Sequence, residues 1–216
     1  MPRIVIDPGH GGSDPGAIAV NGRPEKESNL AVALKVWELL QGSDVQVILT
    51  RTTDSDVSLA ERCKLANKLQ ADAFISLHAD WSPNAGTKGH HAICSIHAKP
   101  GEGGHKLATL LVTALTEHTG RAAFHKGVWQ RASDKVPGRD YYAVIRDTAM
   151  PAVILERGFL SNSEDAALLF NAEFLDKQAQ AVAEAVKLYF DIQVVDWQAR
   201  ALAAEEKLAR VREIIG

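Results

Sequence analysis

The chain has 216 residues, the length of one ordinary domain or of one domain with an appendage. Hydrophobic residues make up 46% and charged residues 24% of it, which is typical of a globular chain and excludes disordered, collagen-like and disulfide-dense classes. The formal net charge of −3 argues against nucleic acid as a partner, because phosphate binding needs a basic surface. The two cysteines, Cys63 and Cys94, are too few for a disulfide framework and are expected to be buried free thiols.

The sequence shows no membrane-spanning segment and no recognisable leader. No apolar run reaches the roughly 18 residues that a span requires. Met1, Pro2 and Arg3 lead directly into a short apolar run that is too brief for a secretory signal. We therefore expect synthesis in the cytoplasm without a signal peptide, with a domain excised from a secreted enzyme as the alternative.

Short apolar runs that are typical of strands alternate with helical patterns along the chain. Strands are predicted at 3–6, 45–50, 73–77, 91–96, 142–145 and 152–155, with a weaker candidate at 128–131. Helical spacing of apolar residues appears over 30–37, 107–118 and 175–189. Ser58 and Glu61 form the pattern of a capping box that opens a further helix to about residue 69. This alternation predicts an α/β fold with a mostly parallel sheet.

The composition changes after Phe190, so we divide the chain into a body of residues 1–190 and a tail of residues 191–216. Six apolar residues in the tail follow heptad spacing: Trp197, Ala201, Ala204, Leu208, Val211 and Ile215. The spacing predicts a helix over about 196–215. It would pack on the body, pair weakly with a second copy, or lead into a further module.

The first predicted strand ends in a glycine-rich turn that contains His10. The carboxyl end of a strand in an open α/β sheet is where ligands bind, and the glycines leave the imidazole uncrowded. A phosphate-binding loop is the alternative, but the Lys and Ser/Thr of a Walker motif are absent. A plain turn with a surface histidine also fits this segment taken alone.

His78 repeats the arrangement at the end of the strand predicted over 73–77. If the two strands are neighbours, both imidazoles lie over one edge of the sheet. A catalytic zinc commonly takes three histidine or carboxylate ligands and a water. Glu25 and Glu27, in the loop after the His10 turn, are both candidates for the carboxylate, although either also suits a helix N-terminus.

Glu156 ends the strand predicted over 152–155. A carboxylate at this position could be a metal ligand or a general base whose pKa is adjusted by partial shielding from water. The alternative is a structural ion pair with Arg157 or Arg146. Three strand ends that carry His, His and Glu favour a metal-dependent site.

The chain resembles the zinc-dependent N-acetylmuramoyl-L-alanine amidases of the third amidase family, which includes bacterial cell-wall amidases and phage endolysins. The resemblance spans about residues 3–190. It rests on IDPGHGGSDPGA at 6–17, EKESNL at 25–30, TRTTD at 50–54, SLHA at 76–79 and PAVILERGFLSN at 151–162. Asp80 departs from the common asparagine, and Arg157 stands where a smaller or apolar residue is common.

The resemblance implies a three-layer α/β fold, with helices on both faces of a twisted sheet, and one Zn²⁺ per chain. Its motifs imply that His10, Glu25 and His78 are the metal ligands, that Glu156 is catalytic and that Glu27 is a bystander. The other histidines match no ligand motif and are expected at the surface or in the core: His90, His91, His97, His105, His118 and His125.

The implied reaction is hydrolysis of the amide bond between N-acetylmuramic acid and L-alanine in peptidoglycan. Arg146 and Arg157 are candidates to bind the oxyanion or the carboxylates of the stem peptide. The alternatives are another zinc amide hydrolase on the same scaffold, such as a carboxypeptidase or deacetylase, and a catalytically silent wall-binding module. The expected partner is peptidoglycan, which an endolysin would reach after release from the cytoplasm.

Overall fold

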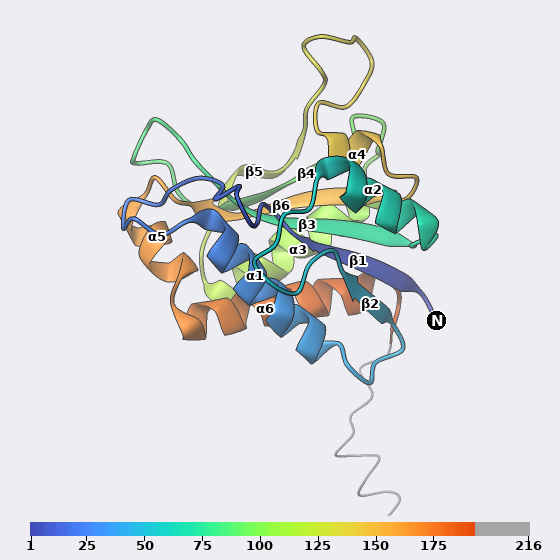
Figure 1. Cartoon of the computed structure of the whole chain (residues 1–216), viewed down its shortest axis with the longest axis horizontal. Helices are drawn as coiled ribbons and strands as arrows, with labels where there is room; N and C mark the ends of the chain where they lie inside the picture. Colours follow the sequence, from blue (N-terminus) through green and yellow to red (C-terminus); the bar gives the residue numbers. More distant parts are fainter. Residues whose placement is uncertain (193–216) are drawn as a thin grey trace, which may run out of the picture.

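The computed structural model describes residues 1–192, and it is built around one six-stranded sheet with the order β2-β1-β3-β6-β4-β5 (Figure 1). The strands are β1 (Arg3–Pro8), β2 (Gln46–Leu49), β3 (Ala73–Asp80), β4 (His90–Cys94), β5 (Ala123–Gln130) and β6 (Ala152–Phe159). β1 pairs in parallel with β2 and β3, and β3 pairs in parallel with β6. β4 is antiparallel to β6 and parallel to β5, so the prediction of a mostly parallel sheet is confirmed.

Helices cover both faces of the sheet and make three layers. They are α1 (Glu25–Leu39), α2 (Leu59–Lys68), α3 (Gly103–Thr119), α4 (Ala143–Arg146), α5 (Ser163–Leu169) and α6 (Ala172–Tyr189). In Figure 1, α1, α3 and α6 lie on one side of the sheet, and α2 and α4 lie on the other. The three-layer α/β architecture is therefore confirmed.

The core is divided by the alternation of side chains along the strands. Ile6 and Leu155 point toward the larger cluster, which contains residues of α1, α3 and α6. Val5 and Ile154, the strand neighbours of those residues, point to the opposite face and pack with residues of α2 and α4 such as Cys63. Cys63 and Cys94 are both free and buried, as expected.

Two helices predicted from the sequence, near residues 58–69 and 30–37, are present in the structure. The capping box at the start of α2 is present, with the Ser58 side chain accepting from the Glu61 amide and the Glu61 carboxylate accepting from the Ser58 amide. The helix predicted over 30–37 is also present, as part of α1. Its buried face, however, carries Asn29, Val32 and Val36, whereas Trp37 is 39% exposed.

The strand predicted over 142–145 is wrong, because this segment forms the short helix α4. The Arg146 and Asp147 amides donate to the Tyr142 and Ala143 carbonyls at 2.9 and 2.8 Å, so the turn satisfies its own backbone. Val144 and Ile145 are buried against the α2 face of the sheet. Apolar burial therefore explains the residue types, and the run is too short for its periodicity to separate a strand from a helix turn.

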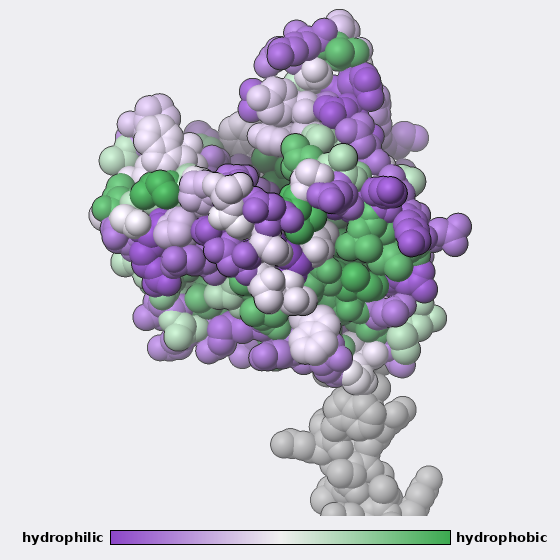
Figure 2. Space-filling view, in the orientation of Figure 1, coloured by the Kyte–Doolittle hydropathy of each residue, from purple (hydrophilic) through white to green (hydrophobic). Residues whose placement is uncertain are grey.

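The segment between β5 and α4 projects from the body at the top of Figure 1. Across the residues that the structure describes, no helix is both long and apolar enough to cross a bilayer. Figure 2 shows hydrophilic residues over much of the visible face, with hydrophobic patches between them. The tail helix predicted over 196–215 lies outside the described residues.

Candidate active site

The site lies where β1, β3 and β6 end. β1 leads through Pro8 and Gly9 into His10, while His78 is near the end of the neighbouring strand β3. His78 is also directly opposite Glu156 in the parallel register of β3 and β6. The three strand ends singled out in the sequence therefore meet at one edge of the sheet, as ligand sites in open α/β sheets do.

Two glycines allow the close approach of backbone to these side chains. A Cβ on Gly9 would lie 2.2 Å from Cε1 of His78, and one on Gly16 would lie 2.6 Å from Oε2 of Glu25. Any larger residue at either position would displace a predicted ligand. His10 itself has a φ of 60°, a backbone conformation that few non-glycine residues adopt. The glycine-rich loop therefore shapes this site closely.

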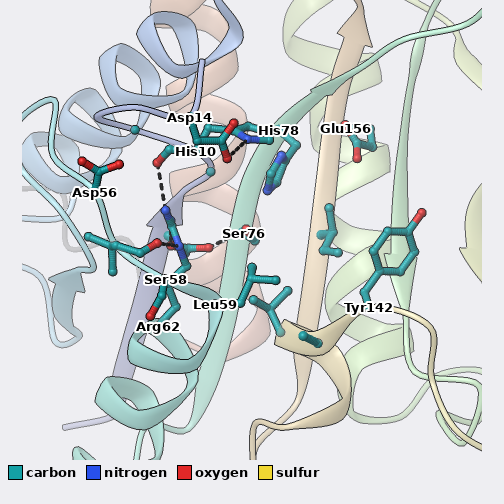
Figure 3. A pocket seen from close by; sticks show the side chains of 17 residues that line it. His10, Asp14, Asp56, Ser58, Leu59, Arg62, Ser76, His78, Tyr142 and Glu156 are labelled. Atoms are coloured by element: carbon teal, nitrogen blue, oxygen red, sulfur yellow. Dashed lines mark hydrogen bonds and ion pairs between the residues drawn. The ribbon is translucent and has the colours of Figure 1, made fainter. Parts of the chain in front are cut away.

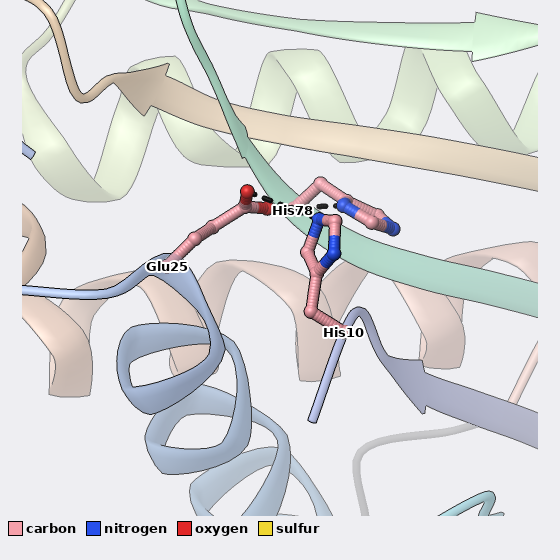
Figure 4. A group of neighbouring side chains, drawn as sticks. All are labelled: His10, Glu25 and His78. Carbon is pink, nitrogen blue, oxygen red and sulfur yellow. Dashed lines mark hydrogen bonds and ion pairs between the residues drawn. The ribbon is translucent and has the colours of Figure 1, made fainter. Parts of the chain in front are cut away.

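His10, Glu25 and His78 form a cluster that could hold a metal ion (Figure 4). Each offers one ligand atom, and these atoms all lie within 4.8 Å of one another. Nε2 of His10 is 3.1 Å from Oε2 of Glu25, and Nδ1 of His78 is 3.0 Å from Oε1. Two histidines with one carboxylate are a donor set used by catalytic zinc, so the residues present fit this metal.

Further hydrogen bonds orient the cluster. Nδ1 of His10 lies 2.7 Å from Oδ2 of Asp14, which turns Nε2 toward Glu25. Histidine ligands in metal sites commonly have such a carboxylate partner on the other ring nitrogen. The buried Glu25 carboxylate accepts backbone N–H groups from Ala17 and Ala79, each at 3.0 Å. Sequence reasoning missed Asp14, although its spacing of four residues from His10 within one turn was a usable signal.

The charges in the cluster alter its titration. Burial lowers the pKa of His10, but hydrogen bonds and the negative charges of Glu25 and Asp14 outweigh burial and raise this pKa above its ordinary value. Burial raises the pKa of Glu25, yet hydrogen bonds from His10 and His78 and their charges hold it well below its usual range. The metal-free cluster therefore has an ionised carboxylate between two imidazoles.

Glu156 is close to this cluster but is not part of it. Its Oε2 atom is buried and makes no hydrogen bond. Burial, and after it the negative charges of Glu25 and Asp80, raise the pKa of Glu156 well above its ordinary value. A carboxylate without a partner is available to exchange a proton, and a raised pKa suits that role.

The site opens into a cavity of about 640 Å³ (Figure 3). His10, His78 and Glu156 line it together with apolar residues from the start of α2 and just before it, from α4 and from β6. The apolar part of the lining consists of Val57, Leu59, Ala143, Val144 and Ile154, with Tyr142 beside it. The part of this wall that Ala143 and Val144 form was not predicted, because α4 was expected to be a strand.

The two arginines proposed as substrate contacts do not line this cavity. The side chain of Arg157 is 3% exposed and donates to Gln178 and Asn29 in the interior, because alternate residues of β6 point to opposite faces. Arg146 donates to Asp147 and to the carbonyl of Tyr141. Neither arginine therefore lines this cavity, and neither forms an ion pair with Glu156 in the described chain.

Glu25 and Glu27 differ sharply, although both lie in the first turn of α1. Glu25 is 3% exposed and contacts both histidines, while Glu27 is exposed and forms an ion pair with Arg23 at 2.9 Å. The structure thus brings Glu25, and not Glu27, to the histidines.

Comparisons with known proteins show the family of this chain. The family model described as N-acetylmuramoyl-L-alanine amidase matches residues 4–188. The amidase CwlM of Bacillus licheniformis is 34% identical over 190 residues, which cover 86% of this chain and 68% of that protein. The endolysin of Bacillus phage SPP1 is 33% identical over 195 residues, covering 86% of this chain and 65% of the endolysin. The chain spans 34% of the length of the amidase LytC of Bacillus subtilis.

Solved structures show the same architecture. The catalytic domain of the amidase CwlV from Bacillus (Paenibacillus) polymyxa var. colistinus aligns with a TM-score of 0.78 and 33% identity, covering 89% of this chain and 100% of that one. An amidase from Clostridium difficile 630 aligns with a TM-score of 0.78 and 29% identity, covering 88% and 97%. With a family match over most of the described residues, the chain belongs to the N-acetylmuramoyl-L-alanine amidase family and is an amidase.

Proposed function

We propose that the chain is a zinc-dependent enzyme that hydrolyses the amide bond between the lactyl group of N-acetylmuramic acid and L-alanine in peptidoglycan. The observation that carries this proposal is the pairing of a His, Glu, His cluster with Glu156 on the next strand, whose Oε2 atom is buried and makes no hydrogen bond. His10, Glu25 and His78 would hold one Zn²⁺ per chain. When bound, the zinc ion supplies a Lewis acid that polarises the scissile carbonyl and increases the acidity of a water molecule.

Glu156 would be the catalytic base and then the acid. It takes a proton from the attacking water as the water oxygen bonds to the carbonyl carbon of the lactyl group. It then returns that proton to the nitrogen of L-alanine as the carbon–nitrogen bond breaks. The products are a lactyl carboxylic acid and a free amine, which become a carboxylate and an ammonium group at neutral pH. Because Oε2 of Glu156 has no hydrogen bond to break, this atom can make both transfers without first leaving a partner.

The cavity supports a bulky substrate rather than a small one. Its volume of about 640 Å³ lies within the range of sites that enclose ligands of drug size. The apolar wall of Val57, Leu59 and Val144 suits aliphatic parts of a substrate. A carboxypeptidase or deacetylase would use the same cluster but release different products, so mass spectrometry of fragments from purified peptidoglycan separates these functions. Free N-terminal alanine on intact stem peptides supports the amidase.

The assigned roles are tested by Glu156→Gln, which keeps the size of the side chain but cannot accept the proton. We expect wall hydrolysis to fall by about 10²- to 10⁴-fold, the usual effect of removing general acid–base catalysis. Zinc content should stay near one per chain, and Glu27→Gln is the matched control at an exposed position. Loss of zinc would make Glu156 a ligand, and full activity with zinc retained would assign the base elsewhere.

The peptidoglycan of the cell wall is the proposed place of action. Synthesis in the cytoplasm and release onto the wall, as in a phage endolysin, is the version we favour, and the SPP1 endolysin among the relatives supports it. Cells that make the protein should lyse only when a membrane pore is also present. Lysis without a pore would favour the alternative, a catalytic domain of a secreted enzyme.

The catalytic unit is proposed to be residues 1–190. The family match over residues 4–188 and the end of α6 at Tyr189 support this boundary. Deleting residues 196–216 should leave wall hydrolysis measurable in a turbidity assay. A folded deletion variant without activity would show that the tail shapes the site.

A further inference from the structure

A buried polar network lies behind the proposed metal site, on the face of the sheet that α1 and α6 cover. At its centre is Arg157, which is 3% exposed. One terminal nitrogen donates to Oε1 of Gln178 at 2.8 Å, and the other donates to Oγ of Ser28 at 3.0 Å and Oδ1 of Asn29 at 2.7 Å. Ser28, Asn29 and Gln178 are themselves almost completely buried. The guanidinium is therefore held in place without any direct carboxylate contact in the described residues.

Burying the Arg157 guanidinium lowers the stability of the fold if the residue serves only to fill space. A buried charge must be compensated, and apolar residues of similar volume often stabilise a core as well or better. The Nε atom of Arg157 is buried and makes no hydrogen bond, which adds to the cost. Burial lowers the pKa of Arg157 to about 10, while the charges of Glu25 and Glu156 act in the opposite direction, so the group is still a cation at neutral pH.

The arginine determines which way the amide of Asn29 faces. Arginine has donors and no acceptor, so the amide must present its oxygen to Arg157. Its nitrogen is then left to donate to Oε1 of Glu25, at 3.0 Å, and to the carbonyl of Gly9, at 3.4 Å. The same Glu25 oxygen accepts the amide of Ala79. One oxygen of Glu25 is thus anchored from behind, and Oε2 is directed toward His10.

We propose that Arg157 is a positioning residue for the metal site, acting through Asn29 to orient the carboxylate of Glu25. This inference rests on the proposed function, because it assumes that Glu25 is a metal ligand. It assigns to Arg157 a role behind the cluster in place of the substrate contact expected from its sequence position. Partners that orient metal ligands in this way commonly contribute 10- to 100-fold to metal affinity.

The test measures zinc affinity by competition with a chromophoric chelator, and the absorption spectrum of the Co²⁺-substituted protein. Arg157→Met removes the donors and the charge while keeping an unbranched side chain. We expect about 10- to 100-fold weaker zinc binding and an altered cobalt spectrum. Arg157→Lys keeps a cationic donor and should recover part of the affinity. Circular dichroism and thermal melting establish that each variant is folded.

A double variant separates positioning from a general effect on stability. If Arg157 acts through Asn29, Arg157→Met combined with Asn29→Ala should bind zinc no more weakly than Asn29→Ala alone. Ser28→Ala is the matched control, since Ser28 is equally buried and accepts from the same arginine nitrogen, but its hydroxyl donates to the Leu169 carbonyl and not to Glu25. It should lower the melting temperature and leave zinc affinity in the folded protein unchanged.

The outcomes distinguish this inference from the function on which it rests. If the wild-type protein binds no stoichiometric zinc, the proposed function fails. If the wild type binds zinc and His78→Ala does not, but Arg157→Met and Asn29→Ala keep wild-type affinity, the positioning role alone is overturned. Losses that add in the double variant, or that Ser28→Ala reproduces, also overturn it. If Arg157→Met does not fold, Asn29→Ala and Arg157→Lys still decide the question.

Discussion

Two pairs of histidines lie in or beside adjacent parts of the same sheet, and their surroundings give them opposite chemistry. The rings of His10 and His78 are 4.9 Å apart at the ends of β1 and β3, with Glu25 between them. His90 and His91 are consecutive residues of β4, and both are buried. The first pair forms a cluster suited to a metal, whereas the second packs into the interior.

The difference lies in the neighbours rather than in the imidazoles. Hydrogen bonds and charges of Glu25 and Asp14 overcome burial and raise the pKa of His10. Burial lowers the pKa of His91 to about 4, with a smaller contribution from His90. His91 stacks on Phe159 at 5.8 Å and has an unpartnered Nδ1, and an Asp80 carboxylate oxygen lies 3.5 Å from its Nε2. A histidine in a strand thus indicates a metal site only when a carboxylate and a second histidine lie close enough to share one ion, as at His10, Glu25 and His78.

The largest expected effect on zinc content comes from replacing a histidine of the first pair, and replacing a histidine of the second pair is its control. His78→Ala deletes one of the three proposed protein ligands, so zinc should fall from about one per chain to a small fraction, and wall hydrolysis should fall to background. His91→Phe replaces an aromatic ring in an aromatic cluster and should keep its zinc. Elemental analysis after gel filtration measures both. Zinc loss in His91→Phe with retention in His78→Ala would reverse the comparison.

A second prediction concerns the pH dependence of zinc binding. Zinc binds neutral imidazole, so a proton on His10 competes with the metal. Because the pKa of His10 is raised above 6.5, the apparent affinity should begin to fall at a pH above that value and should weaken steadily in acid. The slope approaches about tenfold per pH unit for each proton displaced.

Asp14→Asn provides the control for this pH dependence. It removes one of the groups that raise the pKa of His10, so the decline should begin at a lower pH. Chelator competition across a pH series measures both proteins. Identical profiles for the variant and the wild type would show that Asp14 does not act on His10.

His91 of the buried pair should make the free energy of unfolding depend on pH in the direction opposite to that expected for His10. The folded-state pKa of His91 is about 4, below the ordinary value of 6.5, so the unfolded chain binds more protons in that interval. The contribution of a neutral His91 is therefore complete above about pH 6.5 and is lost as the pH falls toward 4, by up to about 3 kcal/mol. For His10, whose folded pKa is raised, the contribution is instead lost as the pH rises.

Urea unfolding of the metal-free protein at several pH values measures this effect. His91→Phe should remove most of the acid-side decline that the wild type shows. An unchanged pH dependence in the variant would assign the decline to other groups.

The smallest effect on zinc binding and stability is expected from a change at Glu27, two residues from the Glu25 carboxylate that lies between His10 and His78. Glu27→Ala breaks an exposed ion pair with Arg23 and should change the free energy of unfolding by less than about 1 kcal/mol, with zinc content and activity unchanged. Glu25→Ala should abolish zinc binding. Elemental analysis and urea unfolding compare them, and zinc loss in Glu27→Ala alone would shift the ligand assignment by two residues.

Much of the site was predictable because parallel strands end at a common edge. His10, His78 and Glu156 each follow or end an apolar run in the sequence, so their meeting required only that β1, β3 and β6 be neighbours. The choice of Glu25 over Glu27 came from the resemblance of the EKESNL motif, since spacing alone permits either residue. The capping box of α2 is likewise local and was read directly from the sequence.

Tertiary structure decided the features that depend on what covers each face of the sheet. The run at 142–145 is apolar in either conformation, and packing against α2 made it a helix that contributes to the cleft wall. Arg157 follows Glu156, the proposed catalytic residue, yet alternation along β6 turns it toward α1 and α6, where Asn29 and Gln178 accept its donors. Sequence determines which residues alternate and where strands end, whereas only the packed layers determine which face is buried and which is open to substrate.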